Sequence, residues 1–463
     1  MTRAGIGFLL RGGALAAALV VVLGAGGGRA QDKTAPKKAP TDDELKEKLT
    51  AFNSAKTESA QLEMLRAFVK DKAAAKRGVA LAAKMHKDAK GKDRPFTYNG
   101  AIVVAKAAHY VKDYAAAEVF YEFCADTATK LESGGKMLAA YDGLVDLYWA
   151  AKKYQDAVET CEKIIEMKGP PELDLARGYF LERLVQSKAL QGNTKEALRI
   201  TDSLIQIDEK DWTLLKLRGW VYREAGKTAE AIEAYQSALD KATTDRRIKA
   251  AERNAEADQI RYTLSGLFVD NDQIDKASEQ LETLIKRNPE NPGFKNDLGF
   301  IWADRGLKLD EAEKLIREAL DLDKKRQDKA VADGRIEKAR ENPAYLDSMG
   351  WVLYKKKDYK AAMPYLKKAA DDEDQGDHLE IWDHLADCEF ALGNKTAAID
   401  AWQRALTFDD ISKRDDARRR KVIAKLKDQG VEPRVAPKTA PPPPVRKIDC
   451  PPPPLAAVHR RER

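Results

Sequence analysis

The chain has 463 residues, of which 34% are charged and 7% are aromatic, and its 81 basic and 75 acidic side chains give a net charge of +6. A charged fraction above the usual ~25%, together with much alanine, lysine, glutamate and leucine, favours helices with solvated outer faces and argues against a mainly β-sheet protein. Four cysteines in this length argue against a disulfide-stabilised scaffold.

Residues 1–30 have the features of an export signal. Arg3 and Arg11 make the start of the chain basic, and Ala14 to Leu23 form a ten-residue apolar run that small residues follow up to Ala30. A spanning helix needs about 20 apolar residues, so we interpret this run as a cleaved signal peptide, with an uncleaved membrane anchor as the alternative. The segment predicts an exported protein that is periplasmic or associated with the cell envelope.

Two segments, 31–42 and 431–463, are predicted to be disordered. The first is a polar spacer, and the second holds ten of the 19 prolines. Because proline fixes φ and lacks an amide donor, this tail should be extended polyproline II and lie outside any core. Cys450 stands between two four-proline runs. We leave open whether it is a free thiol or forms an intermolecular disulfide.

The net charge is unevenly distributed along the chain. Residues 1–30 carry +3, residues 31–412 carry −6, residues 413–430 carry +5 and residues 431–463 carry +4. The basic C-terminal end is therefore compatible with an anionic envelope polymer or lipid headgroups. The alternative is that 413–430 is a solvated capping helix. Nucleic acid is an improbable partner, because the body is acidic and the chain carries an export signal.

Residues 212–239 contain two amphipathic stretches joined at Gly226. Leu215, Gly219 and Tyr222 recur at helical spacing in the first stretch, and a second such series begins at Ala231. Small residues at Gly219 and Ala231 would let two antiparallel helices cross closely. This pattern resembles the tetratricopeptide repeat (TPR), a helix pair of about 34 residues.

Eight copies of this pattern follow one another over residues 98–406. Their second helices are marked by alanines at intervals of 34 to 50 residues, and the two largest intervals contain charged inserts near Lys241 to Ala257 and Asp323 to Glu341. The inserts are interpreted as lengthened helices or an extra exposed turn, with mobile loops as the alternative. The resemblance implies an all-α, right-handed α-solenoid of about eight helix pairs, similar to bacterial exported TPR proteins. Residues 43–97 are expected to form an N-terminal helical cap, and 407–430 a basic capping helix.

Two sets of positions follow from the resemblance. Small residues should pack the two helices of each pair together, at Gly219, Ala231, Gly299, Ala312, Gly350, Ala362, Ala386 and Ala398. Exposed residues of the first helices should line a concave groove that binds a partner, at Tyr110, Trp149, Tyr179, Lys216, Trp220, Arg223, Tyr262, Phe300, Asp347, Trp351, Tyr354, Asp383 and Asp387, with Lys106, His109, Asp142, Asp146, Glu182, Asn296 and Phe390 beside them. Trp, Tyr and Arg favour interface hot spots. The alternative is that a given ring packs against a neighbouring helix.

Signs of catalytic chemistry are weak in this sequence. It has no glycine-rich phosphate loop, GxSxG elbow or HExxH helix, so we expect no enzyme activity and no cofactor. His384 and Cys388 have a spacing that could suit a metal, with Asp377 and His378 nearby, but Cys388 is better explained as a packed apolar residue, and we expect no metal. Cys124 and Cys161 are about one repeat apart and are expected to be buried free thiols, with a disulfide as the alternative.

These features predict a non-enzymatic scaffold in the cell envelope that binds a segment of another exported protein in the concave groove. No transmembrane span is expected in the mature chain. The alternative is a chaperone-like protein or an accessory subunit of an envelope enzyme or export complex.

Overall fold

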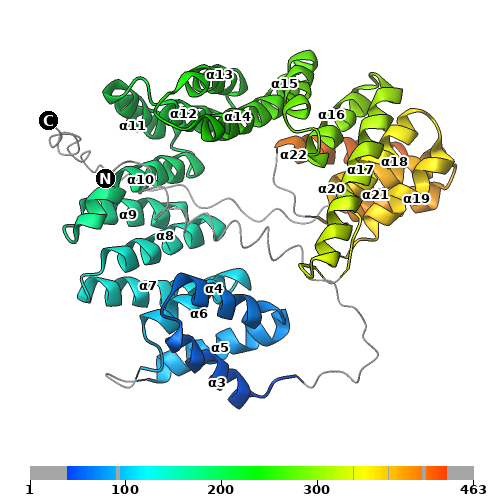
Figure 1. The fold of residues 1–463 in the computed structure, drawn as a ribbon. Coiled ribbons are helices and arrows are strands. Elements are labelled where there is room, and N and C mark those ends of the chain that lie inside the picture. Colours follow the sequence, from blue (N-terminus) through cyan, green and yellow to red (C-terminus); the bar gives the residue numbers. More distant parts are fainter. Residues whose placement is uncertain (1–38, 90–93, 337, 374, 409–412, 435–463) are drawn as a thin grey trace.

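The computed structural model describes residues 39–89, 94–336, 338–373, 375–408 and 413–434, and this part of the chain is all-α, with twenty α-helices and no strand. The helices form a curved stack in chain order, from α3 at one end to α18–α22 at the other (Figure 1). Within these ranges, no helix combines the length and apolarity needed to cross a bilayer. The expected signal peptide, most of the spacer, and the tail from residue 435, including Cys450, lie outside the described residues.

Three helices precede the repeats. They are α3 (Asp42–Ala51), which a 3-10 turn (Phe52–Ser54) follows, α4 (Glu58–Val69) and α5 (Lys72–Asp88). Thr41 begins α3 with a capping box, because its hydroxyl accepts from the Glu44 amide while the Glu44 carboxylate accepts from the Thr41 amide. These helices occupy the region that the sequence analysis assigns to an N-terminal helical cap.

Eight antiparallel helix pairs follow the N-terminal helices. They are α6 (Tyr98–Tyr110) with α7 (Tyr114–Lys130), α8 (Gly134–Ala150) with α9 (Tyr154–Glu166), α10 (Pro171–Leu190) with α11 (Thr194–Ile207), α12 (Trp212–Glu224) with α13 (Thr228–Thr244), α14 (Ala250–Asp270) with α15 (Ile274–Arg287), α16 (Pro292–Arg305) with α17 (Leu309–Ala332), α18 (Pro343–Lys355) with α19 (Tyr359–Ala370), and α20 (Leu379–Ala391) with α21 (Lys395–Ala405). First helices of neighbouring pairs pack side by side toward both ends of the stack. They do so from α6 to α12 and again from α16 to α20.

Small residues allow the helices within a pair to approach closely. A Cβ added to Gly219 would lie 2.7 Å from the Tyr235 ring, and one added to Gly350 would lie 2.5 Å from Leu366. Both distances are shorter than real Cβ contacts, so a larger residue would push the helices apart. Gly299 is equally crowded, at 2.7 Å from Ile316. The alanines of this set are fully buried, at Ala231, Ala312, Ala362, Ala386 and Ala398.

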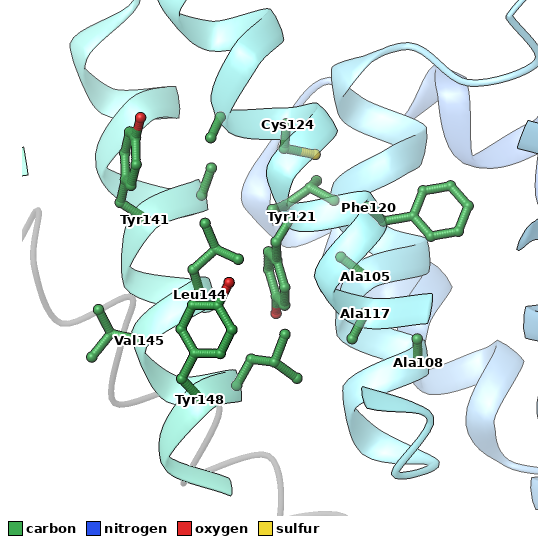
Figure 2. Close-up of a cluster of buried hydrophobic side chains, with 14 of the residues drawn as sticks. Ala105, Ala108, Ala117, Phe120, Tyr121, Cys124, Tyr141, Leu144, Val145 and Tyr148 are labelled. Carbon is green, nitrogen blue, oxygen red and sulfur yellow. The ribbon is translucent and has the colours of Figure 1, made fainter. Parts of the chain in front are cut away.

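Close packing also joins one pair to the next. In Figure 2 the Tyr121 ring of α7 points toward α8, where Leu144 and Tyr148 lie on the facing side. A Cβ on Gly143 of α8 would lie 2.2 Å from this ring. Cys124 and Cys161 are both buried and free in this structure, as is Cys388.

The turn inside each pair has a residue with positive φ just after the first helix, and the turn between α16 and α17 has a second one, Lys308. Glycine takes this position in four pairs, at Gly192, Gly226, Gly306 and Gly393, and the other four use Lys112, Lys152, Asp272 and Lys357. The amide of the positive-φ residue and the next amide both donate to carbonyls in the last turn of the first helix, as at Gly226 and Lys227. The same turn geometry therefore forms with or without glycine.

The two inserts lengthen helices. The first insert extends α13 to Thr244 and starts α14 at Ala250, while the second extends α17 to Ala332. Each insert also includes a connection outside the helices, between α13 and α14 and between α17 and α18.

A last helix, α22 (Lys413–Asp428), closes the stack against α20 and α21. It buries Val422 and Leu426 completely. After the helix, the Arg434 amide donates to Gln403 of α21, so the first residues of the proline-rich tail still pack on the stack.

Candidate functional site

A hollow of about 240 Å³ opens among the first helices α10, α12 and α14, in the middle of the stack. Leu217, Trp220 and Ile260 give it an apolar part, and the buried Tyr235 of α13 forms part of its lining. Polar groups complete the lining, at Glu182, Gln186, Lys216, Arg223, Gln259 and Thr263. An apolar interior among a few polar groups is the usual form of a binding pocket.

The sequence places these side chains together through the packing of α12. Gly219 presses this helix against Tyr235, and the next residue, Trp220, consequently lies beside the hollow. On α14, the position that a Cβ on Gly266 would take has no atom within 4 Å, apart from those of the adjacent residues and the nearby backbone of its own helix. There is therefore free space beside α14 at this residue.

Two of the charged groups that line the hollow, Lys216 and Arg223, are paired with residues close by. Lys216 lies 3.2 Å from Glu256 of α14, and Arg223 lies 2.9 Å from its neighbour Glu224. All four side chains are between 30% and 43% exposed, so these pairs contribute little to stability and can exchange partners at small cost. Four of the residues that the sequence places at the groove line this hollow, namely Glu182, Lys216, Trp220 and Arg223.

The groove residues of the N-terminal repeats contact each other. Tyr179 of α10 donates to Asp142 of α8 over 2.6 Å, and the Trp149 indole donates to Ser187 over 2.8 Å. The Arg183 guanidinium lies 4.0 Å from the centre of the Trp149 ring and binds Asp146. Burial raises the pKa of Asp146, and the guanidinium opposes this shift. These contacts join α8 to α10. Tyr110 is also half-buried against the core.

Trp351 is a correction to the expected exposed groove. Only 7% of it is exposed, because it stacks on His384 of α20 with the ring centres 3.9 Å apart, and on Tyr354 at 4.8 Å. Its indole donates to Asp304 of α16 over 3.3 Å. The alternative reading, in which the ring packs against neighbouring helices, describes this position.

Asp347, on the same helix α18, is buried and faces His384. The Nδ1 atom of His384 lies 3.0 Å from both carboxylate oxygens of Asp347, and Arg418 of α22 donates to Nε2 over 3.0 Å. Nδ1 therefore carries the proton that Asp347 accepts. His384 serves this link between three helices rather than a metal site, and Cys388 contacts the Tyr359 carbonyl. Among the described residues, no three His, Cys, Asp or Glu side chains gather as a metal site would require.

Asp383 and Asp387 hold the last helix. Lys425 of α22 donates to Asp383 over 2.7 Å and to Asp387 over 2.6 Å, and Arg418 lies 3.2 Å from Asp383. Asp383 is 3% exposed, so in this structure it is not a free groove residue. Of the other aromatic candidates, Phe300 is half-buried against the core, while Tyr262 and Phe390 are exposed.

Arg183 and Arg418 are linking residues that sequence reasoning missed. A signal for them exists in the spacing, because the linked residues lie about one repeat apart. Asp146 precedes Arg183 by 37 residues, Asp347 precedes His384 by 37, and Asp383 precedes Arg418 by 35. An acid on one first helix followed by a base one repeat later therefore indicates a link between helices.

Comparison with known proteins identifies the repeats. A family model described as a tetratricopeptide repeat matches residues 182–246, 262–327 and 348–415. A TPR repeat-containing protein of Pseudomonas aeruginosa is 32% identical over 108 residues, which are 23% of this chain and 16% of that relative. The aligned part thus spans about a sixth of the relative's length.

Two solved structures that are similar to this chain are described as tetratricopeptide repeat proteins. A tetratricopeptide repeat protein from Parabacteroides merdae has a TM-score of 0.42 and 15% identity, over 61% of this chain and 98% of its own. The C-terminal part of a TPR repeat-containing protein from Cytophaga hutchinsonii has a TM-score of 0.34 and 15% identity, over 54% and 83% of the two chains.

Proposed function

Because the chain is a tetratricopeptide repeat protein, we propose that it is a non-enzymatic scaffold that binds a segment of a partner protein in the hollow among α10, α12 and α14. The observation that carries this proposal is the hollow itself. It combines Trp220 with weakly paired charges, whereas the aromatic and acidic residues of the flanking repeats are engaged in links between helices. TPR domains bind protein partners, and the hollow offers room for part of one among the first helices.

The place of action in this proposal is the cell envelope. The basic start, the ten-residue apolar run and the small residues before position 31 support export. The partner would then be another exported protein. The surplus basic charge of α22 supports a second contact with an anionic surface, through side chains such as Arg420 and Lys421 that remain exposed.

Filling the hollow tests the site without removing a core residue. In Thr263→Lys a long charged side chain enters the hollow from α14, whereas Ser237→Lys places the same side chain on the exposed face of α13. Tagged chains are incubated with an envelope fraction, and captured proteins are quantified by mass spectrometry. We expect Thr263→Lys to lower the yield of the partner at least tenfold and Ser237→Lys to leave it unchanged. Equal yields from both variants, with unchanged circular dichroism, would rule out the hollow as the binding site.

The same capture separates a scaffold from the alternative, a chaperone-like or accessory protein. One or two partners in fixed stoichiometry support a scaffold or a subunit of an envelope complex. Many unfolded proteins at low occupancy support a chaperone.

A further inference from the structure

A second group of polar side chains continues the concave side from the hollow onto the next helix. On α14, Tyr262 directly precedes Thr263 and is three residues after Gln259. Both Gln259 and Thr263 line the hollow. Across from Tyr262 on α16 are Asn296 and Asp297. We call Tyr262, Asn296 and Asp297 the acceptor cluster.

Asp297 lacks the basic partner that Asp146, Asp383 and Asp387 of other first helices have. Tyr262 donates to its carboxylate over 2.7 Å, and the Asn296 amide nitrogen lies 3.4 Å from its other oxygen. Throughout the described ranges, no Lys, Arg or His side chain comes within 4 Å of this carboxylate. Burial accordingly raises the pKa of Asp297, with only hydrogen bonds to oppose the shift.

Asn296 provides an independent sign of a missing donor. It is 6% exposed, and its side-chain oxygen is buried without a hydrogen-bond partner. Its amide lies against the Asp297 carboxylate, so the unused oxygen belongs to the same small region. Buried polar groups in folded proteins nearly always have a partner, so an unpaired one calls for an explanation such as an absent ligand.

We propose that the acceptor cluster binds a basic side chain, lysine or arginine, of the partner segment whose neighbouring residue occupies the hollow. This inference rests on the proposed function. A lysine or arginine head group carries several N–H donors and a positive charge, so it can serve the Asn296 oxygen and neutralise Asp297 together. The Tyr262 ring, which is 47% exposed, offers a face for the aliphatic stem or the cation.

A peptide library provides the test because the partner itself is not needed. The full chain is immobilised and probed with a positional-scanning library of twelve-residue peptides, in which one position at a time is fixed as Lys, Arg, Ala, Ser, Asp or Glu. We expect Lys and Arg to be enriched about tenfold over Ala at one position. Asp297→Asn should remove this preference, and Asp297→Lys should shift it to Asp and Glu. Glu318→Gln is the matched control, since Glu318 is a carboxylate that already binds Lys295 of α16.

Each result has one meaning. If no peptide binds the wild-type chain, both the proposed function and this inference fail. If peptides bind with no basic preference, or with one that Asp297→Asn leaves unchanged, only this inference fails. A basic preference that appears only in a chain ending at Arg434 would assign the cluster to the basic tail of the chain itself and overturn the assignment to a partner. Thermal melts of each variant verify folding, and the isosteric Asp297→Asn decides the question if Asp297→Lys does not fold.

Discussion

The acids of the first helices differ in what neutralises them. Asp146 has Arg183 on the next first helix, and Asp387 has Lys425 on the last helix, α22. Removing the base from such a pair would leave a buried carboxylate uncompensated, which costs more than the pair contributes. Asp297 already is in that condition, because its neighbours supply hydrogen bonds and no charge.

Asp297→Asn should therefore stabilise the free protein at neutral pH. The pKa of Asp297 is raised in the folded state, so ionisation penalises folding, and this penalty is fully present above the folded-state pKa. As the pH falls toward the unfolded-state value near ~4, the penalty disappears and the two chains should become equally stable. Urea unfolding at pH 7 and at pH 4 measures the difference. A variant that is less stable than wild type at pH 7 would contradict this account.

Part of the candidate site could be predicted from the sequence. The register of the repeat located Lys216, Trp220 and Arg223 on the concave side, because Gly219 fixes which face of α12 packs inward. The register alone could not distinguish Trp220 from Trp351, because each directly follows a glycine that packs the helix pair. The difference depends on the next first helix, which presents His384 to stack on Trp351.

At the scale of helices and turns, the eight turns inside the pairs allow glycine to be compared with other residues at the same positive-φ position. Lys152 has φ of 58°, a left-handed conformation that is costly for a residue with a Cβ, and its side chain is exposed. Lys152→Gly should stabilise the protein by about 0.5–1 kcal/mol, after allowance for the greater freedom of glycine in the unfolded chain. Gly226→Ala, at φ of 71°, should shift the melting temperature the other way. Equal melting temperatures for wild type and both variants would mean that the turns tolerate either residue without strain.

The helix pairs were predictable because each follows the same spacing of small and apolar residues. The inserts had no such pattern, so their composition could not distinguish a longer helix from a loop, and α13 and α17 are longer while the connections after them remain irregular. The N-terminal helices lack the repeat pattern. The residues of the capping box, Thr41 and Glu44, are the sequence signal that indicates where α3 begins.

At the scale of the whole molecule, the core is divided among clusters that share helices. The largest runs from α3 to α12, a second covers α12 to α15, a third runs from α15 to α20, and a fourth joins α20 to α22. Each repeat contacts only its neighbours, so the stability of the stack is a sum of local contributions. The smaller second cluster connects the two long ends of the stack.

Phe268→Ala should uncouple these ends. Phe268 is 2% exposed in the second cluster, and truncating a buried phenylalanine costs about 3–5 kcal/mol. We expect hydrogen exchange to lose protection in α12 to α15 while α6 to α8 keep theirs, and urea unfolding to split into two steps. Phe390→Ala, at an exposed position, should change neither measurement. A single cooperative transition that moves as a whole would show that the stack unfolds as one unit.

The spacing of the linked residues restricts how such a chain can evolve. A protein made of interchangeable modules could gain or lose a repeat by recombination, because every boundary would accept every neighbour. Here the boundaries differ chemically, since Asp146 requires Arg183 one module later, while Asp347 requires His384. Excising the α10–α11 module would set the acids of α8 against the lysine and tryptophan face of α12. The contacts at the boundaries thus depend on the order of the modules. The chain should therefore diverge by point substitution and by inserts such as those after α13 and α17, rather than by changing its number of repeats.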